Sequence, residues 1–285
     1  MLSDLAVLVR APAALTVPGD AFAGAAAAGR LSARTAATAA SSVCLYWAGM
    51  ALNDYADRHL DILERPERPI PSGRVGARTA LTTACALTAA GLGISAWAGG
   101  PRALAGAVPL AVSVWAYDLA FKGTRWGPAA MAATRALDVL RAAGPSGLRS
   151  ALPAAVVACH VHTVTWLSKR EESGSSAALP AATLGMTASL ALALARVSKA
   201  PGRRLPPLAV TAPLAAYLTS FGAAQAQAVR RPTAERIQAA VGAGILGLVP
   251  LQAALVGRTG APKAAALISA VLPLARYLTR RTSPT

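Results

Sequence analysis

Long stretches without a charged side chain dominate this sequence. Seven runs contain no Asp, Glu, Lys or Arg, and they cover residues 35–52, 79–101, 103–117, 150–168, 173–195, 205–229 and 237–257. Three shorter runs, each interrupted by one to three charged residues, cover residues 11–29, 126–143 and 264–279. Most runs approach the length of about 20 residues that an α-helix needs to cross a bilayer. The sequence therefore predicts an all-α membrane bundle, one domain over residues 1–285, with nine or ten transmembrane helices.

The composition agrees with a membrane setting. Charged residues make up 14% of the chain, against about 25% in an ordinary soluble domain. The net charge of +16 could indicate nucleic-acid binding, but the basic residues are spread among short loops and form no stripe with interleaved aromatic side chains. We therefore expect these loops to contact anionic membrane lipid and not nucleic acid.

The short loops also predict an orientation. With ten spans, 16 of the 28 basic residues share one face. They are Arg10, those of segments 58–78, 122–125 and 230–236, Lys169, Arg170, Arg276, Arg280 and Arg281. The positive-inside rule makes this face cytoplasmic, in an integral protein of the plasma membrane. The bias is modest, because a loop on the other face carries Arg196, Lys199, Arg203 and Arg204.

Acidic residues are concentrated in one segment. Five of the twelve lie within fourteen positions: Asp54, Asp57, Asp61, Glu64 and Glu67. On an α-helix, Asp54, Asp57 and Asp61 share one face at successive turns, where their charges repel unless a cation offsets them. Hard oxygen ligands favour Mg²⁺, and the planar guanidinium groups of Arg65 and Arg68 directly after them suit phosphate oxygens. The segment predicts a diphosphate site; a solvated helix end with internal salt bridges is the alternative.

Three motifs connect this segment to a known family. Asn53-Asp54-x-x-Asp57-x-x-x-Asp61, followed by Arg-Pro-Ile-Pro-Ser-Gly at residues 68–73, resembles the first signature of the UbiA superfamily of intramembrane prenyltransferases, which includes 4-hydroxybenzoate polyprenyltransferase-like enzymes. "YDLAFK", residues 117–122, is similar to the family's Tyr-x-x-x-Leu-Lys. "RALDVLRAAG", residues 135–144, is similar to its Arg-x-x-Asn-x-x-x-Gly, with Asp138 in the Asn position.

The resemblance implies roles for these residues. Asp54, Asp57 and Asp61 would hold Mg²⁺, with Asp54, Asp57 and Lys122 as the catalytic residues. The donor's diphosphate would contact Asn53, Arg65, Arg68 and Lys122. Tyr117, Arg135 and Asp138 would face the acceptor. Arg135 and Asp138 are also spaced for an i, i+3 ion pair inside an apolar span, which would serve either helix packing or the substrate pocket.

The second acidic motif departs from the family pattern. Family members carry Asp-x-x-x-Asp between the sixth and seventh spans, whereas this chain has "LSKREESG" at residues 167–174. Ser168 takes the first Asp position, and Glu171 and Glu172 replace the later carboxylates. These glutamates are candidate ligands of a second Mg²⁺, and Lys169 and Arg170 are candidates for direct contact with phosphate.

The predicted reaction is transfer of a prenyl group from an allylic isoprenyl diphosphate to an aromatic or lipophilic acceptor in the membrane. Mg²⁺ and cationic side chains would neutralise the leaving diphosphate. Because the second acidic motif is altered, a non-catalytic membrane subunit is an alternative function. A lipid-binding, metabolite-binding or transport partner is another. The chain lacks the Asp-Gly-x-x-Ala-Arg string of CDP-alcohol phosphotransferases.

Overall fold

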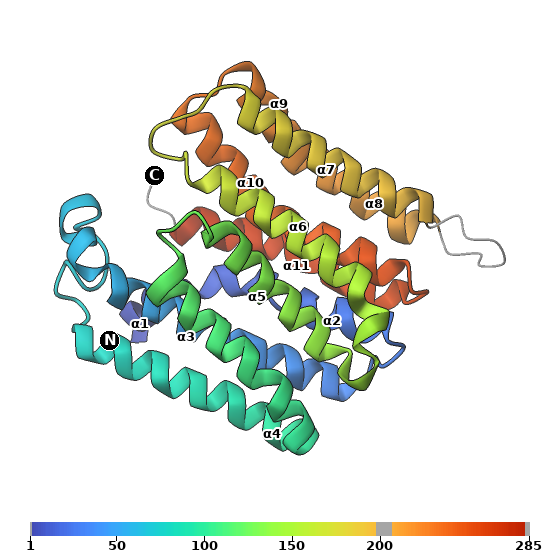
Figure 1. Cartoon of the computed structure of the whole chain (residues 1–285), viewed down its shortest axis with the longest axis horizontal. Coiled ribbons are helices and arrows are strands. Elements are labelled where there is room, and N and C mark those ends of the chain that lie inside the picture. Colours follow the sequence, from blue (N-terminus) through green and yellow to red (C-terminus); the bar gives the residue numbers. More distant parts are fainter. Residues whose placement is uncertain (1, 198–206, 283–285) are drawn as a thin grey trace.

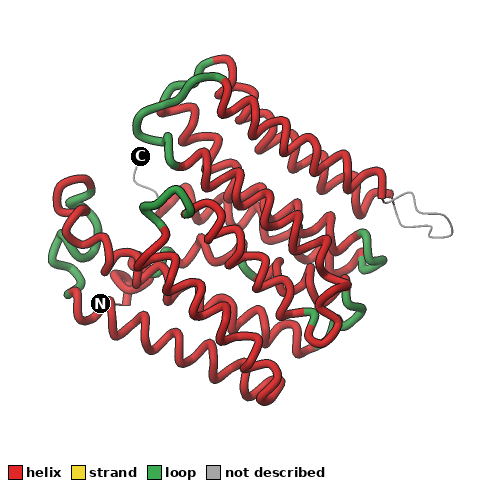
Figure 2. Tube along the Cα trace, in the orientation of Figure 1, coloured by secondary structure: helices red, strands yellow, loops and turns green. Residues whose placement is uncertain are grey.

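The computed structural model describes residues 2–197 and 207–282, which form helices and no strand (Figures 1 and 2). The prediction of an all-α fold is confirmed for these residues. The α-helices are α1 (Leu2–Leu8), α2 (Pro18–Ala27), α3 (Ala33–Glu64), α4 (Ala77–Ala116), α5 (Gly127–Ala142), α6 (Ala151–Ser168), α7 (Ala178–Val197), α8 (Pro207–Tyr217), α9 (Ala223–Arg230), α10 (Ala234–Gly257) and α11 (Pro262–Thr282). The 3₁₀ helices are η1 (Ala11–Thr16) and η3 (Gly144–Ser150), and the π-helices are η2 (Tyr117–Phe121) and η4 (Leu218–Gly222).

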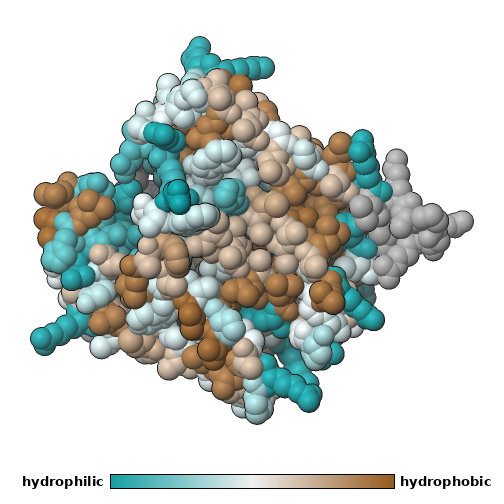
Figure 3. All heavy atoms as spheres, viewed as in Figure 1, coloured by the Kyte–Doolittle hydropathy of each residue, from teal (hydrophilic) through white to brown (hydrophobic). Residues whose placement is uncertain are grey.

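Four helical stretches of the described residues are long and apolar enough to cross a membrane: Ala77–Phe121, Gly144–Ser168, Ala178–Arg196 and Ala234–Gly257. In Figure 3, hydrophobic residues cover much of the middle of the visible face, and many strongly hydrophilic side chains lie near its edges. Nine or ten transmembrane helices remains a prediction. Of the basic loop expected on the far face, Lys199, Arg203 and Arg204 lie outside the described residues.

The loops that carry the sequence motifs meet at one end of the bundle, at the left in Figure 1. Arg65 Nη2 lies 3.2 Å from Glu172 Oε1, so the segment after α3 contacts the segment after α6. Lys169 Nζ donates a hydrogen bond to the Thr124 carbonyl, which adds the loop between η2 and α5. We call this the motif end, and the other end of the bundle the opposite end.

A sharp turn within α4 produces this arrangement. Gly100 has φ 68° and ψ −160°, a conformation that residues with a side chain rarely adopt. Pro101 begins the next stretch, a favourable first position for a helix. The chain reverses here, so that the start of α4 and the end of its second stretch both lie at the motif end (Figure 1). Two antiparallel segments result, corresponding to the uncharged runs 79–101 and 103–117.

The run 11–29 differs from the single span that its sequence predicts. It forms η1 and then α2, with Pro18 at the start of α2. At the break, the carbonyl of Thr16, the last residue of η1, accepts hydrogen bonds from Arg135 Nη2 at 3.0 Å and from Gln252 Nε2 at 2.9 Å. The helix interruption therefore provides acceptors for buried polar side chains of α5 and α10.

Small residues allow the helices to approach closely, as the many Ala and Gly residues predict. A Cβ atom at Gly24 of α2 would lie only 2.0 Å from the Val139 carbonyl oxygen of α5. The largest core cluster lies around α10 and includes the fully buried rings of Tyr217 and Phe221. His160 of α6 is buried among them, with Nδ1 2.9 Å from Tyr217 Oη and Nε2 3.0 Å from the Gly244 carbonyl oxygen.

The contact between Arg65 and Glu172 yields a prediction for the protein in its membrane. Single cysteines introduced at Ser72 and Ser173, after removal of the three native cysteines, should react with a membrane-impermeant thiol reagent from the same side in oriented vesicles. A cysteine at Arg149, in η3 at the opposite end, is the control and should react from the other side. Labelling of positions 72 and 173 from different sides would contradict the arrangement.

Candidate active site

Each carboxylate of the first acidic motif is paired with a cation. Asp54 Oδ1 lies 2.8 Å from Arg10 Nη2, and Asp61 Oδ2 lies 2.7 Å from Arg68 Nη1. Lys122 Nζ lies 2.6 Å from Asp57 Oδ1. Asp54 and Asp61 are buried, whereas the Asp57 side chain is 22% exposed. Asp57 is therefore the most accessible carboxylate of the three.

The proline-rich segment after α3 folds back and returns Arg68 to the helix it follows. Ser72 N donates to the Arg68 carbonyl at 3.0 Å, and Val75 N donates to the Pro69 carbonyl at 2.9 Å. The Arg68 guanidinium contacts Asp61 and lies 3.6 Å from Asp54 Oδ1. The sequence predicts Arg68 as a phosphate ligand, and the structure places it between two of the predicted metal ligands.

The π-helix η2 brings the motif of residues 117–122 beside the first acidic motif. Its wide turn is closed by a hydrogen bond of 2.9 Å from Lys122 N to the Tyr117 carbonyl, five residues earlier. Asn53 Nδ2 donates to Asp118 Oδ1 at 3.1 Å, so the first motif's asparagine contacts η2 directly. Neither Asp118 nor Arg10 is among the predicted site residues. Asp118 could have been found as a carboxylate next to an uncharged run; nothing near Arg10 in the sequence indicates its partner.

The segment with the altered second motif lies at the same end but faces other partners. Glu172 pairs with Arg65, Lys169 contacts the Thr124 carbonyl, and Ser168 Oγ donates to the Thr165 carbonyl at 3.0 Å. Burial raises the pKa of the Glu171 carboxyl, an effect that Arg65 opposes and the neighbouring Glu172 increases. Lys169 and Arg170 line a separate pocket with Trp166 and Leu179.

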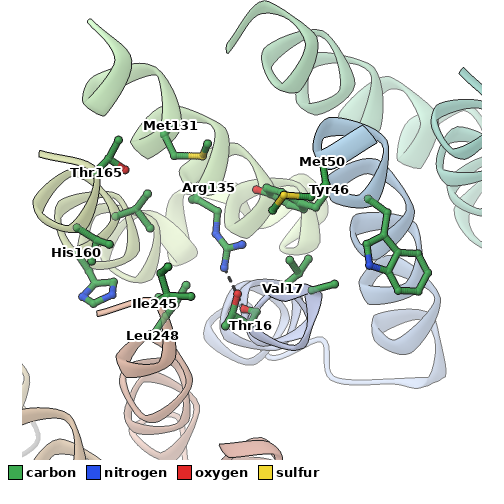
Figure 4. A pocket seen from close by; sticks show the side chains of 14 residues that line it. Thr16, Val17, Tyr46, Met50, Met131, Arg135, His160, Thr165, Ile245 and Leu248 are labelled. Carbon is green, nitrogen blue, oxygen red and sulfur yellow. Dashed lines mark hydrogen bonds between the residues drawn. The ribbon is translucent and has the colours of Figure 1, made fainter. Parts of the chain in front are cut away.

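Two adjoining cavities extend from the first motif into the bundle. The polar cavity, of about 190 Å³, is lined by Arg10, Tyr46, Gly49, Met50, Asn53, Val114, Tyr117, Asp118, Met131 and Thr134. The apolar cavity, of about 220 Å³, shares Tyr46, Met50 and Met131 with it and reaches Val161, His160, Ile245 and Leu248 (Figure 4). The predicted pocket residue Tyr117 thus lines the polar cavity, and Arg135 lines the apolar one.

The predicted ion pair between Arg135 and Asp138 is not formed. Arg135 Nε lies 2.7 Å from Asp20 Oδ2 of α2, and Asp138 Oδ1 lies 2.8 Å from Arg141 Nε on its own helix. Asp138 also accepts a hydrogen bond of 2.7 Å from Ser42 Oγ and lines neither of the two cavities. Its buried carboxylate fixes α5 against α3, and a contact of Asp138 with an acceptor stays a prediction.

The donor atoms fit Mg²⁺ in kind, but the ligands are not gathered around one point. Among the described residues, no three His, Cys, Asp or Glu side chains are close enough together to hold a metal ion. The described ion pairs use one oxygen of each motif aspartate: Oδ1 of Asp54, Oδ1 of Asp57 and Oδ2 of Asp61. All these donors are carboxylate oxygens, the type that Mg²⁺ takes in proteins.

Comparison with known proteins agrees with the motifs. The digeranylgeranylglyceryl phosphate synthase of Ignicoccus hospitalis is 41% identical over 119 residues, or 41% of this chain and 38% of the relative. The bacteriochlorophyll synthase 33 kDa chain of Cereibacter sphaeroides is 35% identical over 86 residues, or 29% of this chain and 28% of the relative. The chain thus aligns with about two-fifths or less of the length of these relatives.

The fold and the whole-chain comparison point the same way. The apo structure of a UbiA homolog from Aeropyrum pernix K1 matches with a TM-score of 0.64 and 21% identity, covering 90% of this chain and 98% of that one, which shows a shared fold. Residues 15–285 match the sequence pattern of the UbiA prenyltransferase family. The chain belongs to the UbiA prenyltransferase family.

Proposed function

We propose that this protein is a Mg²⁺-dependent prenyltransferase that moves a prenyl group from an allylic isoprenyl diphosphate to a lipophilic or aromatic acceptor within the membrane. One observation carries the proposal: the cluster of paired charges meets a polar cavity at Arg10, and this cavity adjoins an apolar cavity inside the bundle. A prenyl diphosphate has the same division, because a charged head is joined to a hydrocarbon chain.

The donor would lie with its head at the motif end and its chain toward the apolar cavity. Met50 and Met131 border both cavities, and methionine side chains adapt their shape to flexible hydrocarbon ligands. Asn53, which lines the polar cavity, and Lys122, which pairs with Asp57, would contact diphosphate oxygens. Arg135 and Tyr117 are the side chains best placed to contact an acceptor, since each contributes a polar group to a cavity wall.

The paired charges suggest how the head is accommodated. Asp54, Asp57 and Asp61 carry three negative charges, and Arg10, Arg68 and Lys122 carry three positive ones. When a magnesium diphosphate binds, these carboxylates would turn to the metal and these cations to the phosphate oxygens. Each of these charged side chains would keep a partner of opposite charge through the exchange, which avoids an unpaired side-chain charge near the membrane.

Mg²⁺ held by the aspartates would supply Lewis-acid stabilisation of the leaving diphosphate. Lys122 would hold a phosphate oxygen as the allylic C–O bond breaks and its electron pair leaves with diphosphate. An acceptor atom then supplies the electron pair for the new bond to the allylic carbon and loses its proton. The apolar walls exclude water, which would otherwise take the acceptor's place.

Glu171 and Glu172 belong to this proposal as ligands of a second Mg²⁺ on the diphosphate. Both lie at the motif end, and Glu172 reaches Arg65 directly after the first motif. A carboxylate there would close the site over the diphosphate head. The motif end would face the cytoplasm of a cell whose plasma membrane holds the protein, since most of the basic loops lie there.

The test is release of diphosphate from a panel of allylic diphosphates by the purified protein, supplied with a lipid extract as acceptor source. Release should need Mg²⁺ and stop with EDTA. Replacing both Glu171 and Glu172 with Gln should lower turnover strongly while much donor binding remains, whereas Lys169→Gln with Arg170→Gln should change it little. The reverse pattern would contradict the second metal. Donor binding without release, for every donor, would favour a non-catalytic subunit.

A further inference from the structure

A large basic cavity lies at the opposite end of the bundle. Its volume is about 900 Å³, and it opens between the start of α3, the turn of α4 and the start of η3. Its lining includes four arginines, Arg30, Arg34, Arg102 and Arg141, with Leu31, Ala98, Ala103 and Pro145 among the apolar residues. No carboxylate is among the described residues that line it. The proposed reaction uses none of these side chains.

The four arginines differ in their contacts: one is held by several partners, and the other three are exposed. The Arg141 side chain is only 5% exposed, and its guanidinium contacts the Asp138 carboxylate, three serine hydroxyls and the Thr38 carbonyl. Arg30, Arg34 and Arg102 are exposed and form no ion pair with a carboxylate of the described residues. Three unpaired guanidinium groups around one cavity repel each other, so an anion bound between them would relieve this repulsion.

The position of this cavity along the axis of the bundle indicates which anions reach it. Arg34 precedes Asp54 by twenty residues on α3, and a rise of about 1.5 Å per residue places them about 30 Å apart along the axis. This is the thickness of the hydrocarbon core of a bilayer, about 30 Å. Trp97 of α4 and Leu148 of η3, at the same end, are 85% and 92% exposed. An exposed Trp is typical of the membrane interface, where phospholipid headgroups lie.

We propose that Arg30, Arg34 and Arg102 form a binding site for the phosphate of an anionic phospholipid in the leaflet opposite the motif end. Guanidinium groups bind phosphate oxygens through paired, charge-assisted hydrogen bonds. The first amide groups of α3, which begins at Ala33 beside Arg34, add a weaker attraction for negative charge. The apolar lining accommodates the glycerol backbone, and the acyl chains continue along the outer surface of α3 and α4.

The test compares lipid retention by the purified full-length chain, using native mass spectrometry from detergent with equimolar phosphatidylglycerol and phosphatidylcholine. The wild-type protein should retain phosphatidylglycerol at least tenfold better. The triple variant Arg30→Gln, Arg34→Gln, Arg102→Gln should lose this preference, and Arg34→Gln alone should lower it. A matched control, Arg149→Gln, Arg196→Gln, Lys263→Gln, removes three exposed charges outside the cavity lining and should retain it.

Equal retention by the wild-type protein and the triple variant would overturn the site, as would an equal loss in the control. A further arm adds millimolar inorganic phosphate. Complete displacement of the lipid would assign the cavity to soluble phosphate and overturn the lipid as its ligand, whereas retention of the lipid supports it. Melting temperatures measured without added lipid should match among the variants, because the substituted side chains are exposed.

Discussion

Replacing Asp57 with Asn should lower the affinity for a magnesium allylic diphosphate at least tenfold, or about 1.4 kcal/mol. The amide keeps the size of the side chain and removes its charge. Asp57 is the most accessible aspartate of the motif, and its partner Lys122 is a predicted phosphate ligand. The variant therefore loses a metal ligand and the charge balance of its lysine together. Equilibrium binding of a non-reacting thiolo analogue of the donor measures the effect without turnover.

The control for this prediction is Glu64→Gln. Glu64 lies two turns further along α3, is exposed, and forms no ion pair among the described contacts. Its substitution removes the same charge near the same helix end and should leave the affinity within about twofold, because exposed charges contribute little. If Asp57→Asn binds the analogue as wild type does, with and without EDTA, Asp57 does not support a metal.

Replacing Asp20 with Asn should lower the free energy of unfolding by about 3–5 kcal/mol, the usual cost of removing one member of a buried ion pair. Asp20 is fully buried, with one oxygen 2.7 Å from Arg135 Nε and the other accepting a hydrogen bond of 2.7 Å from Gln252. Without its charge, the Arg135 guanidinium is left unpaired beside the apolar cavity. Unfolding in mixed detergent micelles, followed by circular dichroism, measures the change.

A second variant separates the ion pair from other losses at this position. Adding Arg135→Met to Asp20→Asn removes the unpaired charge and puts a shorter, unbranched apolar chain in its place. The double variant should recover most of the lost stability, because removal of a whole buried pair is often nearly neutral. Wild-type stability of Asp20→Asn, or no recovery in the double variant, would show that the pair does not stabilise the bundle.

The sequence predicts those parts of the site that lie within one motif. Asn53 through Asp61 lie on consecutive turns of one helix, so their spacing alone places them together. Pairing with Arg10 cannot be read in this way, because it joins residues 44 positions apart and depends on how η1 packs against α3. The contact between Asn53 and Asp118 has the same origin, since only the reversal at Gly100 returns η2 to α3.

The pairing of Asp138 shows why local spacing is ambiguous within a single helix. Arg135 and Arg141 each lie three residues from Asp138 on α5, and the sequence does not indicate which one is the partner. The choice is made by η1 and α2, because the Thr16 carbonyl of η1 and the Asp20 carboxylate of α2 bind Arg135 and leave Asp138 to Arg141. Hydrophobic runs likewise predict where helices occur. They do not predict that the run 11–29 is divided at Pro18 into η1 and α2.

The most direct test of prenyl transfer is a search for its product. Purified protein is incubated with labelled allylic diphosphates, Mg²⁺ and a lipid and metabolite extract of the native cells, and the products are analysed by mass spectrometry. We expect an adduct heavier than its acceptor by one prenyl group, formed by the wild-type protein and lost in Asp54→Ala. Binding of donors without an adduct, across all donors and extracts, would contradict the account and favour a non-catalytic role.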